Sequence, residues 1–192
     1  GVMIPLDSAL LETDRQLTSN GIATAYHALT LSWEPGLRSV DMGWQIVRAL
    51  DRLRPRLTAE NRLQLRWETF CSDAEPLIAH VLSGQDRPSL VFNDPTTSML
   101  LHPDVALQDR PFDQVADYPV TPFDAPRFLK KMADQARRAH VTPEDYVALL
   151  TSVWDRRAEV PADIARMAAL ARSHRAPMLS HDDTQAETRA YY

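Results

Sequence analysis

Side chains that could bind a metal ion lie at the end of a short apolar run near the carboxyl terminus. The segment APMLSHDDTQAET, residues 176–188, changes from apolar to polar at His181, Asp182 and Asp183. Imidazole and carboxylate groups are ligands of zinc, manganese and iron, and hydrolytic sites combine three protein ligands with an open water position. A metal bound there lowers the pKa of its water to near neutral. His181 is therefore a candidate metal ligand, whereas Asp182 and Asp183 could instead cap a following helix.

Three further apolar segments also end in polar residues. The first ends near His27 and Thr30, the second at Glu68, and the third at Asn93 and Asp94. His27 lies inside an apolar stretch, which favours a core or pocket histidine with a hydrogen-bond partner over a metal ligand. Asp94 precedes Pro95 and could simply begin a turn. Polar strand ends are common in α/β proteins, so these residues are candidates and do not identify a reaction.

Glu68 has two interpretations. It follows Trp67 in a segment whose neighbours indicate burial. Because an unpaired buried carboxylate is costly, this residue needs a partner. A salt bridge to Arg66 or Arg48 and a role as a metal ligand both satisfy that need, and the sequence leaves the two open.

The elements that must position these residues alternate between strands and helices. Segments rich in β-branched and aromatic residues predict strands at 21–33, 62–70, 88–94 and 176–180. Apolar residues at helical spacing predict helices at 6–20, 40–53, 72–84, 123–140, 142–159 and 161–175. Residues 95–122 contain five prolines and little periodicity, and with the helices that follow they form a predicted insertion over about 95–160. Strands that alternate with helices pair in parallel, so the sequence predicts an α/β fold.

Four such strands form either a small open sheet or an arc of a (β/α)8 TIM barrel. A complete barrel needs about 250 residues, whereas this chain has 192. We therefore expect residues 1–192 to form a single, partial TIM-barrel domain with its functional residues at the carboxyl ends of the strands. The strands at both ends of such an arc would present unpaired edges, which favours a homo-oligomer or pairing with a missing portion of the barrel.

Composition excludes several classes of protein. The net charge is −5, which argues against nonspecific nucleic-acid binding. The single cysteine, Cys71, excludes an internal disulfide and a multi-cysteine zinc site, and it favours a cytoplasmic location. No apolar run approaches the roughly 20 residues that span a bilayer. A glycine-rich phosphate loop and a Gly-x-Ser-x-Gly elbow are both absent from the sequence.

Several of these segments resemble one enzyme family. The ending PMLSHDDTQAET is similar to the SHDD segment of the amidohydrolase-superfamily enzymes of phosphonate breakdown, the α-D-ribose 1-methylphosphonate 5-triphosphate diphosphatases. RLQLRWETF and SLVFND resemble two successive strands of that family, and ETDRQLTSNGIATAYHAL resembles the stretch that leads into its second barrel strand. The resemblance follows the family's order through nearly the whole chain, and SHDD is its most specific element.

The resemblance implies the central part of a metal-dependent hydrolase on a (β/α)8 barrel. Its substrate would be a phosphorylated small molecule, a ribosyl triphosphate that is cleaved to a monophosphate and pyrophosphate. The implied metal ligands are Glu68 and His181, and the implied catalytic residues are Asp182 and Asp183, which line the site or orient His181. Zinc is the expected divalent metal, with manganese and iron as alternatives.

Two departures from the family bear on activity. Pro95 stands where the family has a histidine ligand, and the family's first strand, with its His-x-Asp or His-x-His ligands, has no counterpart here. We therefore expect the chain alone to be weakly active or inactive. The alternative hypothesis is a noncatalytic α/β binding or interaction module with a degenerate metal site.

Overall fold

A four-stranded parallel sheet is the centre of the structure. The computed structural model describes residues 4–84, 87–96 and 125–180, and for 125–129 and 131 it describes only the backbone. The strands lie in the order β1-β2-β3-β4, each beside the next in sequence. Their bounds are Thr24–Leu31 for β1, Glu60–Glu68 for β2, Ser89–Asn93 for β3 and Met178–Ser180 for β4. The predicted α/β fold with parallel strands is confirmed.

The described helices occupy the predicted segments. They are α1 (Leu6–Ser19), α2 (Val40–Leu53), α3 (Glu75–Leu82), α5 (Ala125–Ala139), α6 (Pro143–Asp155) and α7 (Val160–Ser173). The helix predicted at 72–84 begins later, because a short 3-10 turn occupies Ser72–Ala74 and a proline in the first turn favours a new start at Glu75. None of these helices is both long and apolar enough to cross a membrane.

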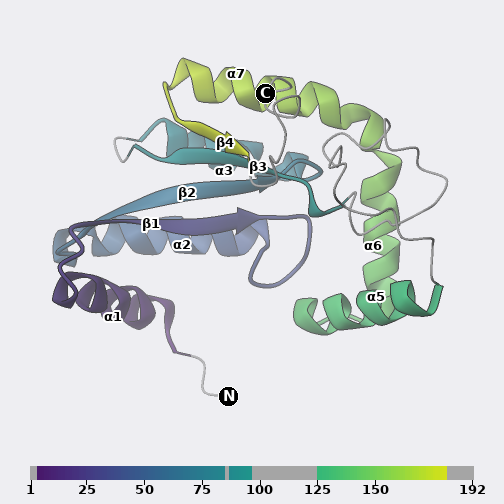
Figure 1. The fold of residues 1–192 in the computed structure, drawn as a ribbon, viewed down its shortest axis with the longest axis horizontal. Coiled ribbons are helices and arrows are strands. Elements are labelled where there is room, and N and C mark those ends of the chain that lie inside the picture. Colours follow the sequence, from purple (N-terminus) through teal and green to yellow (C-terminus); the bar gives the residue numbers. More distant parts are fainter. Residues whose placement is uncertain (1–3, 85–86, 97–124, 181–192) are drawn as a thin grey trace.

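One face of the sheet is covered by helices. Figure 1 shows α2 and α3 behind the strands, with α1 beside β1 and α7 beside β4. The core between helices and sheet is apolar, and its fully buried side chains include Leu31, Leu65, Trp67, Leu77, Ile78, Leu90 and Met167. Tyr26 and Leu179 point to the opposite face, where 46% and 44% of their surfaces are exposed.

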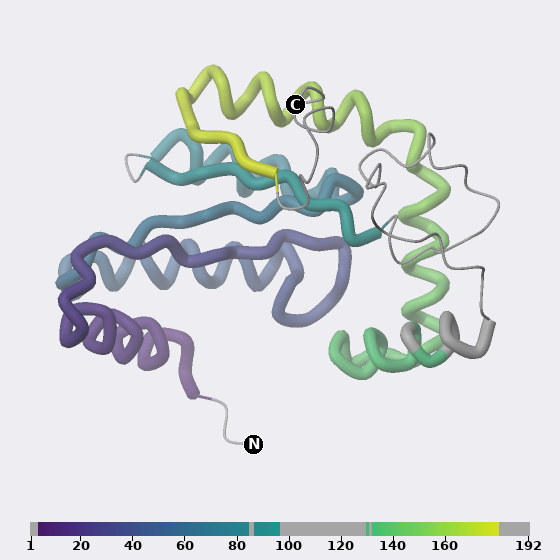
Figure 2. The backbone as a smooth tube through the Cα atoms, in the orientation of Figure 1, coloured from purple at the N-terminus to yellow at the C-terminus, as the bar shows by residue number. Residues whose placement is uncertain are grey.

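Two helices stand at the carboxyl ends of the strands. Figure 1 places α5 and α6 at the end to which the strand arrows point. They pack on each other through a small cluster that contains Met132, Tyr146 and Leu150, against which Trp33 is packed. In Figure 2 the chain then runs from α6 into α7, returns along the sheet and enters β4. This arrangement places α6 close to the strand ends where functional residues are expected.

Candidate functional site at the strand ends

The loop after β1 brings an arginine to the strand ends. Ser32 donates its backbone N–H to the carbonyl of Arg38 at 2.8 Å, and Ser32 and Ser39 form an isolated parallel bridge. Gly36 makes the reversal possible, because its φ of 88° lies in the left-handed region that favours glycine. The Ser39 hydroxyl then accepts from the backbone N–H of Met42 and caps α2. The backbone of Arg38 is thereby fixed beside the end of β1.

Glu68 is the last residue of β2 and is completely buried, with an exposed fraction of 0%. One of its oxygens, Oε2, accepts a hydrogen bond from the Ser32 hydroxyl at 2.6 Å. The other, Oε1, accepts from Nη2 of Arg38. The counter-ion of Glu68 is therefore Arg38, 30 residues before it, and neither of the arginines that the sequence suggests, Arg66 and Arg48.

A second buried carboxylate shares the same guanidinium. Nη1 of Arg38 donates to Oε2 of Glu34 at 2.7 Å. The other oxygen of Glu34 accepts from the hydroxyl of Tyr146, a fully buried residue of α6. One permanent positive charge therefore lies between two buried carboxylates that come from different strand ends.

Burial dominates the electrostatics of this cluster. It raises the pKa of Glu68 to about 7, although Arg38 and the Ser32 hydroxyl oppose the shift and the nearby carboxylates of Glu34 and Asp94 add to it. Burial and the hydrogen bond to Glu34 raise the pKa of Tyr146 well above its ordinary value, so its hydroxyl stays protonated and donates. A carboxyl group with a pKa near 7 can exchange a proton close to neutral pH.

Helix α6 is attached to the strand ends by two aromatic residues. The rings of Trp33 and Tyr146 lie 5.5 Å apart, centroid to centroid, and are tilted by 47°. The indole N–H of Trp33 donates to the hydroxyl of Thr96 at 2.8 Å. Because the hydroxyl of Tyr146 also reaches Glu34, α6 contacts the carboxylate cluster directly.

The remaining predicted site residues follow β4. Its last residue, Ser180, pairs with Phe92 of β3, and the next residue of β3, Asn93, pairs with Glu68. The predicted metal ligand His181 and the predicted catalytic residues Asp182 and Asp183 lie outside the described residues, as does the loop at 97–124. Of the four site residues that the resemblance implies, Glu68 is the one that lies within the described residues.

His27 does not lie at a strand end, because β1 continues to Leu31. Its Nε2 lies 2.6 Å from the side-chain oxygen of Asn61. The amide nitrogen of Asn61 already donates to Asp14 and to the carbonyl of Ala59, so His27 is the donor in this contact. The half-buried His27 thus has the hydrogen-bond partner that the core-or-pocket interpretation requires.

Asp14 of α1 anchors the beginning of β2. Burial raises the pKa of this carboxyl group, but hydrogen bonds from the backbone N–H groups of Thr58 and Ala59 and from the side-chain amide of Asn61 outweigh it. The pKa of Asp14 is therefore lower than its ordinary value of 3.8. This buried carboxylate supports the fold rather than the strand-end cluster.

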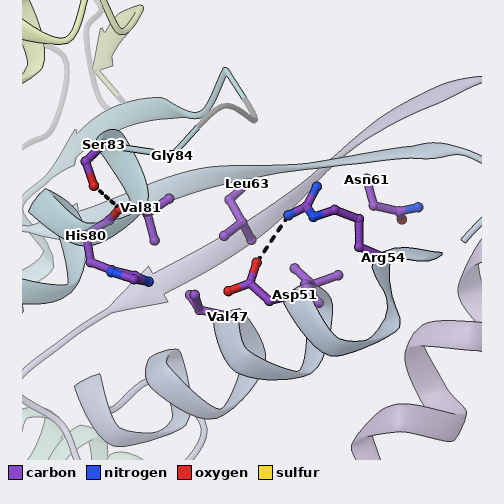
Figure 3. A pocket seen from close by; sticks show the side chains of 10 residues that line it. Val47, Asp51, Arg54, Asn61, Leu63, His80, Val81, Ser83 and Gly84 are labelled. Carbon is purple, nitrogen blue, oxygen red and sulfur yellow. Dashed lines mark hydrogen bonds and ion pairs between the residues drawn. The ribbon is translucent and has the colours of Figure 1, made fainter. Parts of the chain in front are cut away.

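A cavity of about 440 Å³ lies between α2, α3 and the first half of β2. Figure 3 shows Asp51 and Arg54 of its wall joined by an ion pair, with His80 across the cavity from them. The ring of His80 also lies 5.2 Å from that of Trp44. This cavity is on the helix-covered face, away from the carboxyl end of β2 where Glu68 lies, so it belongs to a different region of the molecule.

The described residues do not fit a metal ion as they are arranged. Among them, no group of three or more His, Cys, Asp or Glu side chains could hold one. Both oxygens of Glu68 accept hydrogen bonds, and the positive charge of Arg38 beside them would repel a metal ion. His181, the other predicted ligand, is outside the described part, so the expected metal site stays a prediction.

Comparisons with known proteins add no family to this description. No family model, no curated protein and no solved structure matches the chain.

Proposed function

We propose that this chain forms the central part of a hydrolase of the amidohydrolase superfamily. Its reaction would resemble the hydrolysis of ribose 1-methylphosphonate 5-triphosphate to pyrophosphate and a monophosphate in phosphonate catabolism. The observation that carries the proposal is Glu68, a fully buried carboxylate at the carboxyl end of β2. Functional residues of parallel α/β folds lie at that end, and the resemblance assigns this glutamate a role there.

The sheet order supports an arc of a (β/α)8 barrel. Each strand lies beside the next in sequence, whereas a doubly wound sheet reverses its order partway. Helices α2 and α3 cover one face, as the outer layer of a barrel does. The opposite face would be the barrel interior, and Tyr26 and Leu179 are exposed on it. In this proposal a second copy of the chain or a missing barrel portion covers that face.

The chain's own residues have distinct roles in the proposed site. Ser32 and Arg38 orient the carboxylate of Glu68, while Tyr146 and Arg38 orient that of Glu34. His181 stays a proposed metal ligand, and Asp182 and Asp183 stay proposed catalytic residues. Zinc remains the expected metal, with manganese and iron as alternatives, and the cytoplasmic location remains a prediction from the single cysteine.

Single-turnover hydrolysis tests the proposal. With the chain in excess over a ribosyl triphosphate and with Zn²⁺ or Mn²⁺ present, we expect slow pyrophosphate release that falls at least tenfold in Glu68→Gln. Glu60→Gln is the matched control, because Glu60 begins the same strand and its side chain is half exposed. Release that is equal in wild type and Glu68→Gln contradicts the proposal.

The second candidate function is a noncatalytic α/β binding module. The observation that favours it is the engagement of both Glu68 oxygens by Ser32 and Arg38, together with Pro95 at the family's histidine position. Such a module would bind the same phosphorylated ligand without releasing pyrophosphate. Equilibrium binding of the ligand, measured alongside hydrolysis, separates the two functions.

A further inference from the structure

The cavity between α2, α3 and β2 has the size and the lining of a small-molecule site. Its volume of about 440 Å³ lies within the roughly 300–1,000 Å³ that such sites occupy. Its walls combine apolar side chains with a small number of charged and polar ones, which is the usual composition of such sites. The apolar members are Val47, Leu50, Leu63 and Val81. Because the cavity lies on the helix-covered face, a ligand in it is separate from the strand-end carboxylates.

One wall of the cavity is fixed by hydrogen bonds. Asn61 lines the cavity and is buried. Its amide nitrogen donates to Asp14 and to the carbonyl of Ala59, while its oxygen lies 2.6 Å from Nε2 of His27. These contacts hold the wall in place before a ligand arrives, which lowers the entropic cost of binding.

An ion pair lies at the wall of the cavity. Nη2 of Arg54 lies 3.2 Å from Oδ1 of Asp51, and the two side chains are 47% and 55% exposed. A pair as exposed as this contributes little to stability. A guanidinium carries five N–H donors and a carboxylate has two oxygens, so the pair can bind a ligand while it remains intact. It offers a donor for an anion and an acceptor for a cation side by side.

A ligand with a single charge does not match this pair. Asp51 repels an anion that approaches Arg54, and Arg54 repels a cation that approaches Asp51. A zwitterion avoids both repulsions, because each of its charges can face the opposite member of the pair. The ammonium and carboxylate groups of an α-amino acid are attached to the same carbon atom, so they can face two neighbouring side chains at once.

An aromatic side chain lies across the cavity from the ion pair. Figure 3 shows the ring of His80 directed from α3 towards α2, and this ring lies 5.2 Å from that of Trp44. An amino acid whose charged groups face the ion pair therefore extends its side chain between the apolar walls towards His80. Aromatic rings gain both from apolar burial and from ring–ring contacts of this kind.

We propose that this cavity binds an α-amino acid with an aromatic side chain. The carboxylate of the ligand faces Arg54, its ammonium group faces Asp51, and its ring lies between the apolar walls beside His80. The inference does not rest on the proposed function, since it uses a different region of the molecule.

A series of related ligands tests each part of the proposal. We expect L-phenylalanine at pH 7 to bind at one site with a Kd below about 1 mM, measured by isothermal titration calorimetry. Phenylethylamine lacks the carboxylate, 3-phenylpropanoate lacks the ammonium group and L-alanine lacks the ring, so each should bind at least tenfold more weakly. Absence of L-phenylalanine binding, or equal affinity for any of these three compounds, overturns the inference.

A second ion pair on the same helix provides the matched control. Arg54→Met and Asp51→Asn should each weaken L-phenylalanine binding at least tenfold. Arg52 of α2 pairs with Asp7 of α1 at 2.5 Å, and their side chains are 59% and 44% exposed. Arg52→Met and Asp7→Asn remove the same charges outside the cavity lining and should change the affinity less than twofold. A loss of equal size in both pairs overturns the inference.

A further measurement uses the wild-type chain, in case a variant does not fold. The ring of a bound phenylalanine should shift the proton resonances of the His80 imidazole, which are assigned by comparison with His80→Gln. His174 is also exposed and lies outside the cavity lining, so it serves as the internal control. The shift of His80 should exceed that of His174 at least fivefold, and equal shifts overturn the inference.

Discussion

The hydroxyl of Tyr146 connects α6 to the strand-end carboxylates, and its removal tests that connection. Tyr146 is fully buried, and its hydroxyl donates to Oε1 of Glu34. Tyr146→Phe keeps the ring and its contact with Trp33 but leaves this buried oxygen without that donor. A hydrogen bond to a charged group contributes about 1.5–3 kcal/mol. We therefore expect Tyr146→Phe to lower the free energy of unfolding by about 2 kcal/mol.

Urea unfolding followed by circular dichroism measures this change. The midpoint should fall while the m-value stays constant, since neither the folded nor the unfolded state changes in compactness. In thermal unfolding the same loss corresponds to a decrease in Tm of about 4–8 °C for a chain of this size.

The matched control is Tyr26→Phe. Tyr26 is 46% exposed and its hydroxyl accepts from Arg62 at 2.9 Å, so water can replace this contact. Its removal should change the free energy of unfolding by less than about 0.5 kcal/mol. If Tyr146→Phe lowers the free energy of unfolding no more than Tyr26→Phe does, the hydroxyl of Tyr146 does not stabilise the buried carboxylate. The proposed attachment of α6 through this hydroxyl is then refuted.

Three further predictions concern the scaffold. Asp14→Asn should lower the free energy of unfolding by about 2 kcal/mol at pH 7, because this carboxylate accepts three hydrogen bonds. Since folding lowers the pKa of Asp14, the stability that its carboxylate contributes is present above pH 3.8 and is lost as the pH falls through the folded-state pKa. Urea titrations at several pH values measure this loss, with the exposed Glu12→Gln as control. A stability difference between wild type and Asp14→Asn that did not shrink in acid would contradict the prediction. Burial raises the pKa of the Cys71 thiol to about 12. The thiol should therefore react with a disulfide reagent at pH 8 only when the chain is unfolded in urea. Rapid reaction of the folded chain would refute the burial of Cys71. Ser39→Ala should cost about 1 kcal/mol by removing the cap that accepts from Met42, and an unchanged Tm would contradict that role.

Local patterns in the sequence were sufficient to predict the positions of the described helices and strands. The predicted helix at 40–53 coincides with α2, because its apolar residues recur at helical spacing and Pro55 prevents its continuation. Thr142 caps α6 as the first-turn residues indicate, with its hydroxyl accepting from the backbone N–H of Asp145. Such features depend on residues a few positions apart, which a sequence displays directly.

The partners of Glu68 and Glu34 could not be predicted in the same way. Arg38 precedes Glu68 by 30 residues and Tyr146 follows Glu34 by 112, so these contacts depend on the sheet register and on the docking of α6. One local signal did exist. The glycine turn and the cap at Ser39 fix the length of the loop after β1, which places Arg38 next to the strand ends.

The products of hydrolysis test the central claim most directly. With the chain in excess over ribose 1-methylphosphonate 5-triphosphate and Mn²⁺ removed by chelation after the reaction, phosphorus NMR identifies every phosphate-containing product. The account predicts pyrophosphate and a ribosyl 5-monophosphate in equal amounts, with neither formed by Glu68→Gln. Inorganic phosphate as the released product, or pyrophosphate release that Glu68→Gln leaves undiminished, would contradict it.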